Sequence, residues 1–293
     1  MKLAVSSYSF QQYINAGKMT QLDVIARAAE MGFAGVDYID LTPVSHPTLE
    51  QQLAYAAEIR KEAEKRGVEI VAYTVGANLF CGSAEEDAKE VERLLGQVDV
   101  AAALGAGILR HDVCYSESVK DGFVGFDRML PVIAENARRI TEYAQGKGIR
   151  TCSENHGYIA QDSDRVERLY YAVDHKNYGL LVDVGNFACV DENSAHAVSR
   201  LAPYAIHVHV KDFYVHPFGY TPREGEKTFR TRACGVLSGC AIGDGDIPVE
   251  QCLAIFKRAK YDGFLTVEYE GNEDCIAGIS RGRDRLLGYL ERV

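Results

Sequence analysis

The segment at 178–186 reads Tyr-Gly-Leu-Leu-Val-Asp-Val-Gly-Asn, a short apolar run that ends in the carboxylate of Asp183. Runs of this kind, bounded by turn residues, are typical of buried strands in parallel sheets. Three more apolar runs carry a polar side chain at or near their end: Glu154 in 149–154, His209 in 205–210 and Glu268 in 264–268. We therefore expect four buried strands, each of which delivers a carboxylate or an imidazole to the loop that follows it.

The spacing of these groups indicates how the strands are connected. The gaps are 29 residues from Glu154 to Asp183 and 26 from Asp183 to His209, close to the roughly 30 residues of one strand–helix–strand unit. Four strands are expected upstream, at 3–5, 35–39, 69–73 and 107–111, alternating with helices at 22–31, 53–66, 84–104 and 129–147. Glycines at 32, 67, 105, 148, 179 and 263 precede the strands, where we expect them to end helices in the left-handed conformation.

Eight such units predict an α/β fold, a single (β/α)8 barrel over residues 1–293. A doubly wound open sheet is the competing fold, but no glycine-rich phosphate-binding motif follows the first strand. The gap from His209 to Glu268 is 59 residues, so the chain has an enlarged loop after strand seven, between Asp212 and Pro248. This loop is rich in Tyr, Phe, Arg and His, and long loops of compact domains are commonly lids or binding loops.

Composition narrows the functional class. The net charge of −10 argues against nucleic acid or an anionic membrane surface as the main partner. No apolar run is long enough for a membrane span, and the first residues lack the apolar region of a secretion signal. The eight cysteines are scattered without CxxC spacing; Cys234 and Cys240 share one loop, but we expect no disulfide between them. A cytoplasmic protein with reduced thiols is expected.

The four strand-end groups predict a metal site. In barrel enzymes the functional side chains lie at the carboxyl ends of the strands, and three carboxylates that meet there would repel one another without a cation. Any one of them alone is equally well explained as a helix cap or an ion-pair partner, but four on successive strands favour a shared ion. The oxygen-rich ligand set suits Mn²⁺ best, with Mg²⁺ or Co²⁺ as alternatives.

Four segments carry a resemblance to a known family: Ser153-Glu154-Asn155, Val182-Asp183-Val184-Gly185-Asn186, His207-Val208-His209-Val210-Lys211-Asp212 and Tyr261-Asp262-Gly263-Phe264-Leu265-Thr266-Val267-Glu268. In these segments the chain resembles the sugar phosphate isomerase/epimerase group of xylose-isomerase-like TIM barrels, which includes tagatose and psicose 3-epimerases, hydroxypyruvate isomerase and inosose dehydratase. The resemblance implies that Glu154, Asp183, His209 and Glu268 are the metal ligands. It also implies that Glu154 and Glu268 transfer protons at a carbon next to a carbonyl, through an enediolate.

The function expected first is a divalent-metal-dependent sugar isomerase or epimerase. Its substrate is expected to be a small, non-phosphorylated keto-sugar, because the aspartates of Gly243-Asp244-Gly245-Asp246 would repel a phosphate. The alternative is a lyase or dehydratase that acts on a keto-inositol or a 3-keto-glycoside and completes an elimination after the same proton abstraction. A nuclease of the endonuclease IV type is disfavoured by the net negative charge and by Asn186, which stands where that class has a histidine. A non-catalytic sugar-binding barrel is disfavoured because Glu154 and Glu268 are both present.

Further residues are candidates for substrate contact. His156 lies two positions after Glu154, Asn186 three after Asp183, and Lys211 two after His209. His111 ends strand four and is expected at the same mouth, and Arg232 of the enlarged loop is a candidate for binding an anionic group. His207 shares a strand face with His209, and we expect it to pack behind that ligand. The sequence is compatible with a homo-oligomer or with a partner subunit.

Overall fold

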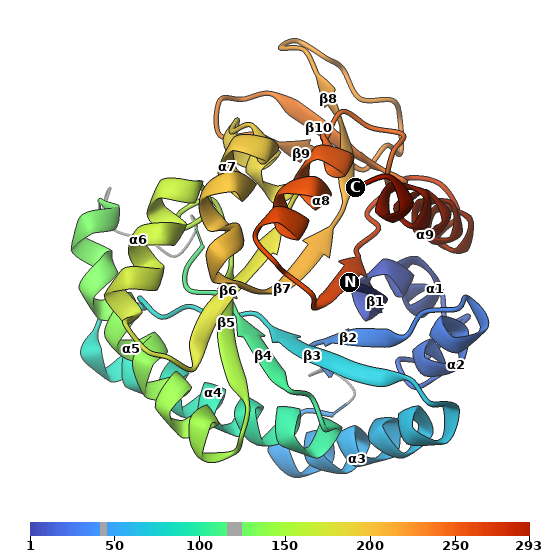
Figure 1. The fold of residues 1–293 in the computed structure, drawn as a ribbon. Coiled ribbons are helices and arrows are strands. Elements are labelled where there is room, and N and C mark those ends of the chain that lie inside the picture. Colours follow the sequence, from blue (N-terminus) through green and yellow to red (C-terminus); the bar gives the residue numbers. More distant parts are fainter. Residues whose placement is uncertain (42–45, 116–124) are drawn as a thin grey trace.

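Eight parallel strands close into a barrel surrounded by helices (Figure 1). The computed structural model describes residues 1–41, 46–115 and 125–293. Around the barrel the strands follow the order β1-β11-β7-β6-β5-β4-β3-β2. Their bounds are β1 Lys2–Ser6, β2 Gly35–Ile39, β3 Glu69–Val75, β4 Ile108–His111, β5 Arg150–Glu154, β6 Tyr178–Asp183, β7 Ala205–Val210 and β11 Phe264–Val267. The predicted barrel is confirmed.

The outer layer consists of the helices that connect successive strands and of α9, which follows the last strand. Their bounds are α1 Gln11–Asn15, α2 Asp23–Glu30, α3 Leu49–Arg66, α4 Ala84–Leu104, α5 Phe126–Gly146, α6 Ser163–Val173, α7 Ser194–Leu201, α8 Val249–Arg258 and α9 Cys275–Arg292, with 3-10 turns η1 Ser7–Phe10, η3 Asn186–Val190 and η4 Ala202–Tyr204. Helix α3 begins four residues before the expected position because Thr48 and Gln51 form a capping box. Within the described residues, no helix is long and apolar enough to cross a lipid bilayer.

The glycines before the strands do not all have the expected role. Gly67 ends α3 with φ +67°, as predicted for a left-handed helix terminus. Gly179 instead lies inside β6, where a Cβ would collide with the side chain of Ile206. It is therefore required by close packing between the strand and its neighbour, and that part of the prediction is wrong.

The barrel interior is apolar at one end and polar at the other. A small apolar cluster of Ala4, Val71 and Phe264 includes the first residue of β11. Glu268 directly follows the same strand, so the polar groups gather at the opposite, carboxyl end. The main apolar core lies between the strands and the surrounding helices.

The enlarged segment after β7 folds into an antiparallel sheet of its own, beside the barrel in Figure 1. Its strands are β8 Asp212–His216, β9 Phe229–Arg230 and β10 Val236–Cys240, in the order β8-β10-β9. The expectation of an enlarged segment is correct, and the sheet within it was not anticipated. Its strands are short, and β8 pairs with β10 from His216↔Val236 to Asp212↔Cys240, so local sequence patterns do not reveal this pairing.

Candidate metal and catalytic site

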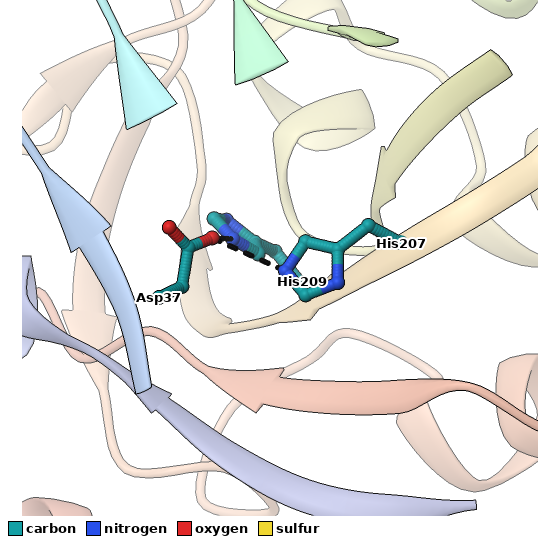
Figure 2. A group of neighbouring side chains, drawn as sticks. All are labelled: Asp37, His207 and His209. Carbon is teal, nitrogen blue, oxygen red and sulfur yellow. Dashed lines mark hydrogen bonds and ion pairs between the residues drawn. The ribbon is translucent and has the colours of Figure 1, made fainter. Parts of the chain in front are cut away.

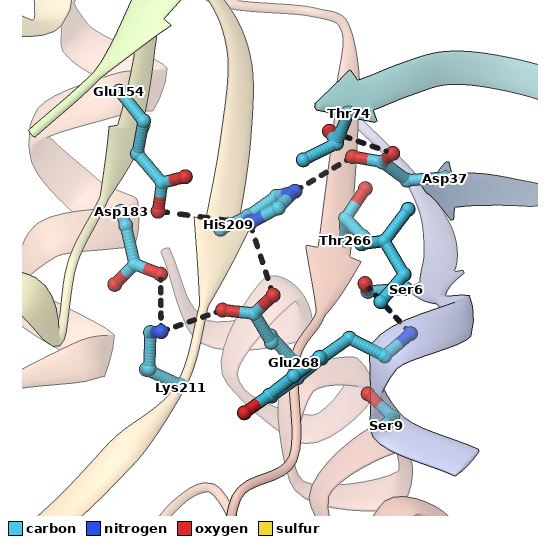
Figure 3. Close-up of polar contacts among 12 residues, drawn as sticks. Ser6, Ser9, Asp37, Thr74, Glu154, Asp183, His209, Lys211, Thr266 and Glu268 are labelled. Carbon is cyan, nitrogen blue, oxygen red and sulfur yellow. Dashed lines mark hydrogen bonds and ion pairs between the residues drawn. The ribbon is translucent and has the colours of Figure 1, made fainter. Parts of the chain in front are cut away.

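The four predicted strand-end groups converge at the carboxyl end of the barrel (Figure 3). Glu154 and Asp183 are the last residues of β5 and β6, His209 lies in β7, and Glu268 follows β11. Each side chain is buried, and each offers one ligand atom such that all four atoms lie within 4.8 Å of one another. The strand-end positions thus bring three carboxylates and one imidazole to a single point, as the spacing of the sequence indicates.

Two buried atoms of this cluster show that the residues fit a divalent ion. Nδ1 of His209 and Oδ2 of Asp183 make no hydrogen bond, although Oδ2 lies 3.3 Å from the ammonium of Lys211. Nδ1 lies 3.7 Å from Oε1 of Glu268 and 4.0 Å from Oε1 of Glu154, too far for a hydrogen bond. Buried polar atoms without partners are costly, and an ion among these four groups would satisfy both. The oxygen-rich set is compatible with Mn²⁺, Mg²⁺ or Co²⁺, and also with Zn²⁺.

The ammonium group of Lys211 lies among the carboxylates. Its Nζ is 2.5 Å from Glu268, 3.3 Å from Asp183 and 3.3 Å from Glu270. Burial alone would lower the pKa of Lys211, but these carboxylates raise it well above its usual value. The charge compensation is incomplete, because burial still raises the pKa of Asp183 to about 7 despite the nearby lysine. Lys211, predicted to contact substrate, is an internal counter-charge in this structure.

Glu154 is held on both of its oxygens. Arg110, which points inward from β4, forms an ion pair with Oε2, and Nδ2 of Asn186 donates to Oε1 over 2.8 Å. Asn186 was predicted as a substrate contact, but its buried side chain supports Glu154. Arg110 also pairs with Asp112 at 2.8 Å. Arg110 was not among the predicted site residues.

His156 forms an aspartate–histidine pair at the rim of the site. Its Nδ1 lies 2.9 Å from Oδ1 of Asp112, while 42% of its side chain remains exposed. Burial opposes protonation, but the charge of Asp112 and the hydrogen bond to it raise the pKa of His156. Tyr115 donates a second hydrogen bond to Asp112. The predicted position of His156 at the mouth therefore fits an acid that substrate can reach.

Two predicted substrate contacts lie elsewhere. His111 is fully buried, and its Nδ1 is bonded to the backbone carbonyl of Asp112. Side chains alternate along a strand, so when Arg110 points into the barrel, His111 points toward the helices. Arg232 is occupied by Asp162 at 3.0 Å and by the backbone carbonyl of Tyr158. Neither side chain contributes to the cluster.

Asp37 is a site residue that the sequence analysis missed. It is fully buried on β2, and its Oδ2 lies 2.7 Å from Nε2 of His209 and 3.1 Å from Nε2 of His207 (Figure 2). Burial alone would raise the pKa of Asp37, but the hydrogen bonds from both histidines hold it well below its usual range. His207 thus lies behind His209, as expected from their shared face of the strand. The signal in the sequence was a carboxylate flanked by apolar residues in a predicted strand.

The segment between β7 and α8 makes contacts across the barrel mouth. The hydroxyl of Tyr158, in the loop after β5, donates to the backbone of Arg230, and Gly239 pairs with Gly271 after β11. Lys227 lies over the ring of Tyr8, which follows β1. This segment therefore joins the loops of three barrel strands at the end that carries the polar cluster.

Backbone amides of the glycine–aspartate stretch at 243–246 already donate hydrogen bonds within the protein. The carboxylate of Asp212 accepts hydrogen bonds from the amides of Gly243, Gly245 and Ile247. These amides are therefore not free to bind a phosphate.

All eight cysteines are free thiols, including Cys234 and Cys240.

Comparisons with known proteins agree with this fold. A family model described as xylose isomerase-like TIM barrel matches residues 25–287. Inosose dehydratase of Clostridium perfringens is 24% identical over 223 residues, which cover 72% of this chain and 73% of that protein. The structure is similar to that of the IolI protein with a bound zinc atom (TM-score 0.76, 13% identity, 100% and 99% of the two chains). It is also similar to D-psicose 3-epimerase solved in the presence of D-fructose (TM-score 0.71, 17% identity, 98% of each chain).

Proposed function

Because the chain belongs to the xylose isomerase-like TIM barrel family, we propose that it is a metal-dependent enzyme acting on a polyhydroxylated, non-phosphorylated keto compound. The proposed reaction begins with removal of a proton from the carbon next to the carbonyl. The observation that carries the proposal is the convergence of Glu154, Asp183, His209 and Glu268 within 4.8 Å. An ion held there would supply positive charge to the carbonyl oxygen and so make the neighbouring proton more acidic.

Glu268 is the proposed base. Both oxygens of Glu154 are held by side-chain donors, those of Arg110 and Asn186. In contrast, Oε1 of Glu268 lies 3.7 Å from Nδ1 of His209, beyond hydrogen-bonding distance. That looser contact leaves a lone pair of Glu268 available for the proton.

The fate of the deprotonated substrate separates two candidate functions. In an epimerase, a group on the opposite side, here Glu154, returns a proton to the same carbon. In a dehydratase, the bond from the next carbon to its hydroxyl oxygen breaks, a carbon–carbon double bond forms, and the hydroxyl takes a proton and leaves as water. The His156–Asp112 pair favours elimination, because its exposed imidazolium can donate that proton. The likeness to inosose dehydratase favours the same outcome.

The experiment compares an inosose with D-psicose and D-fructose as substrates for the Mn²⁺-loaded protein in deuterated water. Elimination predicts a product lighter by one water, and epimerisation predicts a product of unchanged backbone with deuterium at the reacting carbon. We expect Glu268→Gln to abolish deuterium uptake into substrate, and His156→Gln to block water loss more than uptake. Glu273→Gln is the matched control, since Glu273 is exposed and pairs with Arg281. Uptake that persists in Glu268→Gln would refute the assignment of the base.

A further inference from the structure

Asp37, His207 and His209 form a buried hydrogen-bonded group behind the proposed metal ligands (Figure 2). All three side chains are excluded from solvent. Asp37 lies on β2 and the histidines on β7, so the contact crosses the barrel interior. A buried carboxylate is tolerated only where donors satisfy it, and this one has three side-chain donors.

The donors define how Asp37 is used. Oδ1 accepts a hydrogen bond from the hydroxyl of Thr74 over 3.0 Å. Oδ2 faces Nε2 of His209 at 2.7 Å and Nε2 of His207 at 3.1 Å. An ionised carboxylate can only accept, so the hydrogens must reside on the two Nε2 atoms. Nδ1 of His209 is then the nitrogen left to face Glu154, Asp183 and Glu268, as Figure 3 shows.

We propose that Asp37 is a positioning residue that sets the tautomer and ring orientation of His209, so that Nδ1 presents its lone pair to a divalent ion. The negative charge of Asp37 also increases the electron density of the imidazole, which strengthens it as a ligand. Thr74 and His207 hold Asp37 in turn, which fixes the direction of its Oδ2. This inference rests on the metal site of the proposed function, but not on the reaction carried out there.

Asp37→Asn is the sharpest variant, because it keeps the shape and removes the charge. An asparagine amide can turn its donor toward Nε2 and force the hydrogen onto Nδ1, where the ion should bind. We expect the affinity for Mn²⁺, measured from the electron paramagnetic resonance signal of free ion, to fall about 10- to 100-fold, as is typical for loss of such outer partners. Asp37→Glu, which retains the carboxylate, should recover part of this loss.

Asp212→Asn is the matched control. Asp212 is also a buried aspartate at this end of the barrel, but the hydrogen bonds it accepts come from backbone amides. We expect Asp212→Asn to lower stability without weakening Mn²⁺ binding. If Asp37 were merely structural, the two variants would behave alike. A second readout is the ¹⁵N spectrum of the histidines in Zn²⁺-loaded protein, in which the wild type should show Nε2 protonated and Nδ1 bound to metal.

The outcomes separate this inference from the metal site itself. If the wild type binds no divalent ion, the proposed function fails first. If the wild type binds one ion and folded Asp37→Asn binds it with unchanged affinity, the positioning role is refuted. Two ions per wild-type chain, one of them lost in His207→Gln, would also overturn it, because Asp37, His207 and His209 would then form a second metal site.

Discussion

Replacing Lys211 by methionine tests whether its ammonium acts as a counter-charge to the carboxylates. Nζ lies 2.5 Å from Glu268 and 3.3 Å from both Asp183 and Glu270, and Lys211→Met keeps the length of the side chain while removing the charge. Removal of one partner of a buried ion pair costs about 3–5 kcal/mol. For a chain of 293 residues, an unfolding entropy of about 2.1 cal/mol/K per residue converts this loss to a fall in Tm of about 5–8 °C.

The assay measures thermal and urea unfolding of the metal-free and the Mn²⁺-loaded protein. Without metal, we expect the full destabilisation, because the carboxylates lose their nearest cation. With saturating Mn²⁺ the variant should recover most of it, and its metal-induced rise in Tm should exceed that of the wild type. Lys227→Met is the matched control, since Lys227 is exposed at the same mouth and lies over the ring of Tyr8. Equal metal-free stabilities of Lys211→Met and Lys227→Met, or an equal metal-induced shift in Lys211→Met and the wild type, would refute the reasoning.

Three further predictions address individual groups. Burial would raise the pKa of Asp112, but the charge of Arg110 and the contacts from His156 lower it below the value of about 3.9 in an unfolded chain. The ionised carboxylate of Asp112 therefore stabilises the fold above about pH 3.9, and this stabilisation is lost as the pH falls below that value. Urea unfolding of Asp112→Asn between about pH 5 and pH 2 should therefore show a weaker acid dependence than the wild type. Arg232→Gln should retain turnover, because the guanidinium is engaged by Asp162 rather than by substrate; a loss of kcat would contradict this. Ellman's reagent should modify Cys234, the exposed thiol, and leave Cys81 unreacted, because burial raises the pKa of that thiol to about 11; rapid loss of several thiols would argue against the packing.

The barrel and the four converging groups were accessible from the sequence because both depend on local periodicity. A buried parallel strand is a short apolar run, and its last residue must lie at the carboxyl end of the barrel. The positions of Glu154 and Asp183 follow from this rule alone. The metal ligands, their ion and the reaction remain predictions that the experiments above test.

The partners of these groups were harder to predict because they lie far apart in sequence. Asp37 and His209 are separated by 172 residues, and only closure of the barrel brings them together. Arg110 and His111 are adjacent, and the sequence does not show which of them points inward until the register of β4 is known. The sheet of β8, β9 and β10 poses a similar problem, because antiparallel pairing across a long insertion depends on contacts rather than on composition.

The formal charges around the cluster support the proposal that it binds one divalent ion. Glu154, Asp183, Glu268 and Glu270 carry four formal negative charges, and Arg110 and Lys211 supply two positive charges in direct ion pairs. Asp112 pairs with His156, and Asp37 accepts hydrogen bonds from the histidines of β7; neither aspartate is among the four carboxylates counted here. The four carboxylates and two cations together leave two formal negative charges, which one divalent cation would neutralise. Burial, together with the charges of Glu154 and Glu268, raises the pKa of Asp183 to about 7 against the opposing charge of Lys211, and a cation at this point would lower it again.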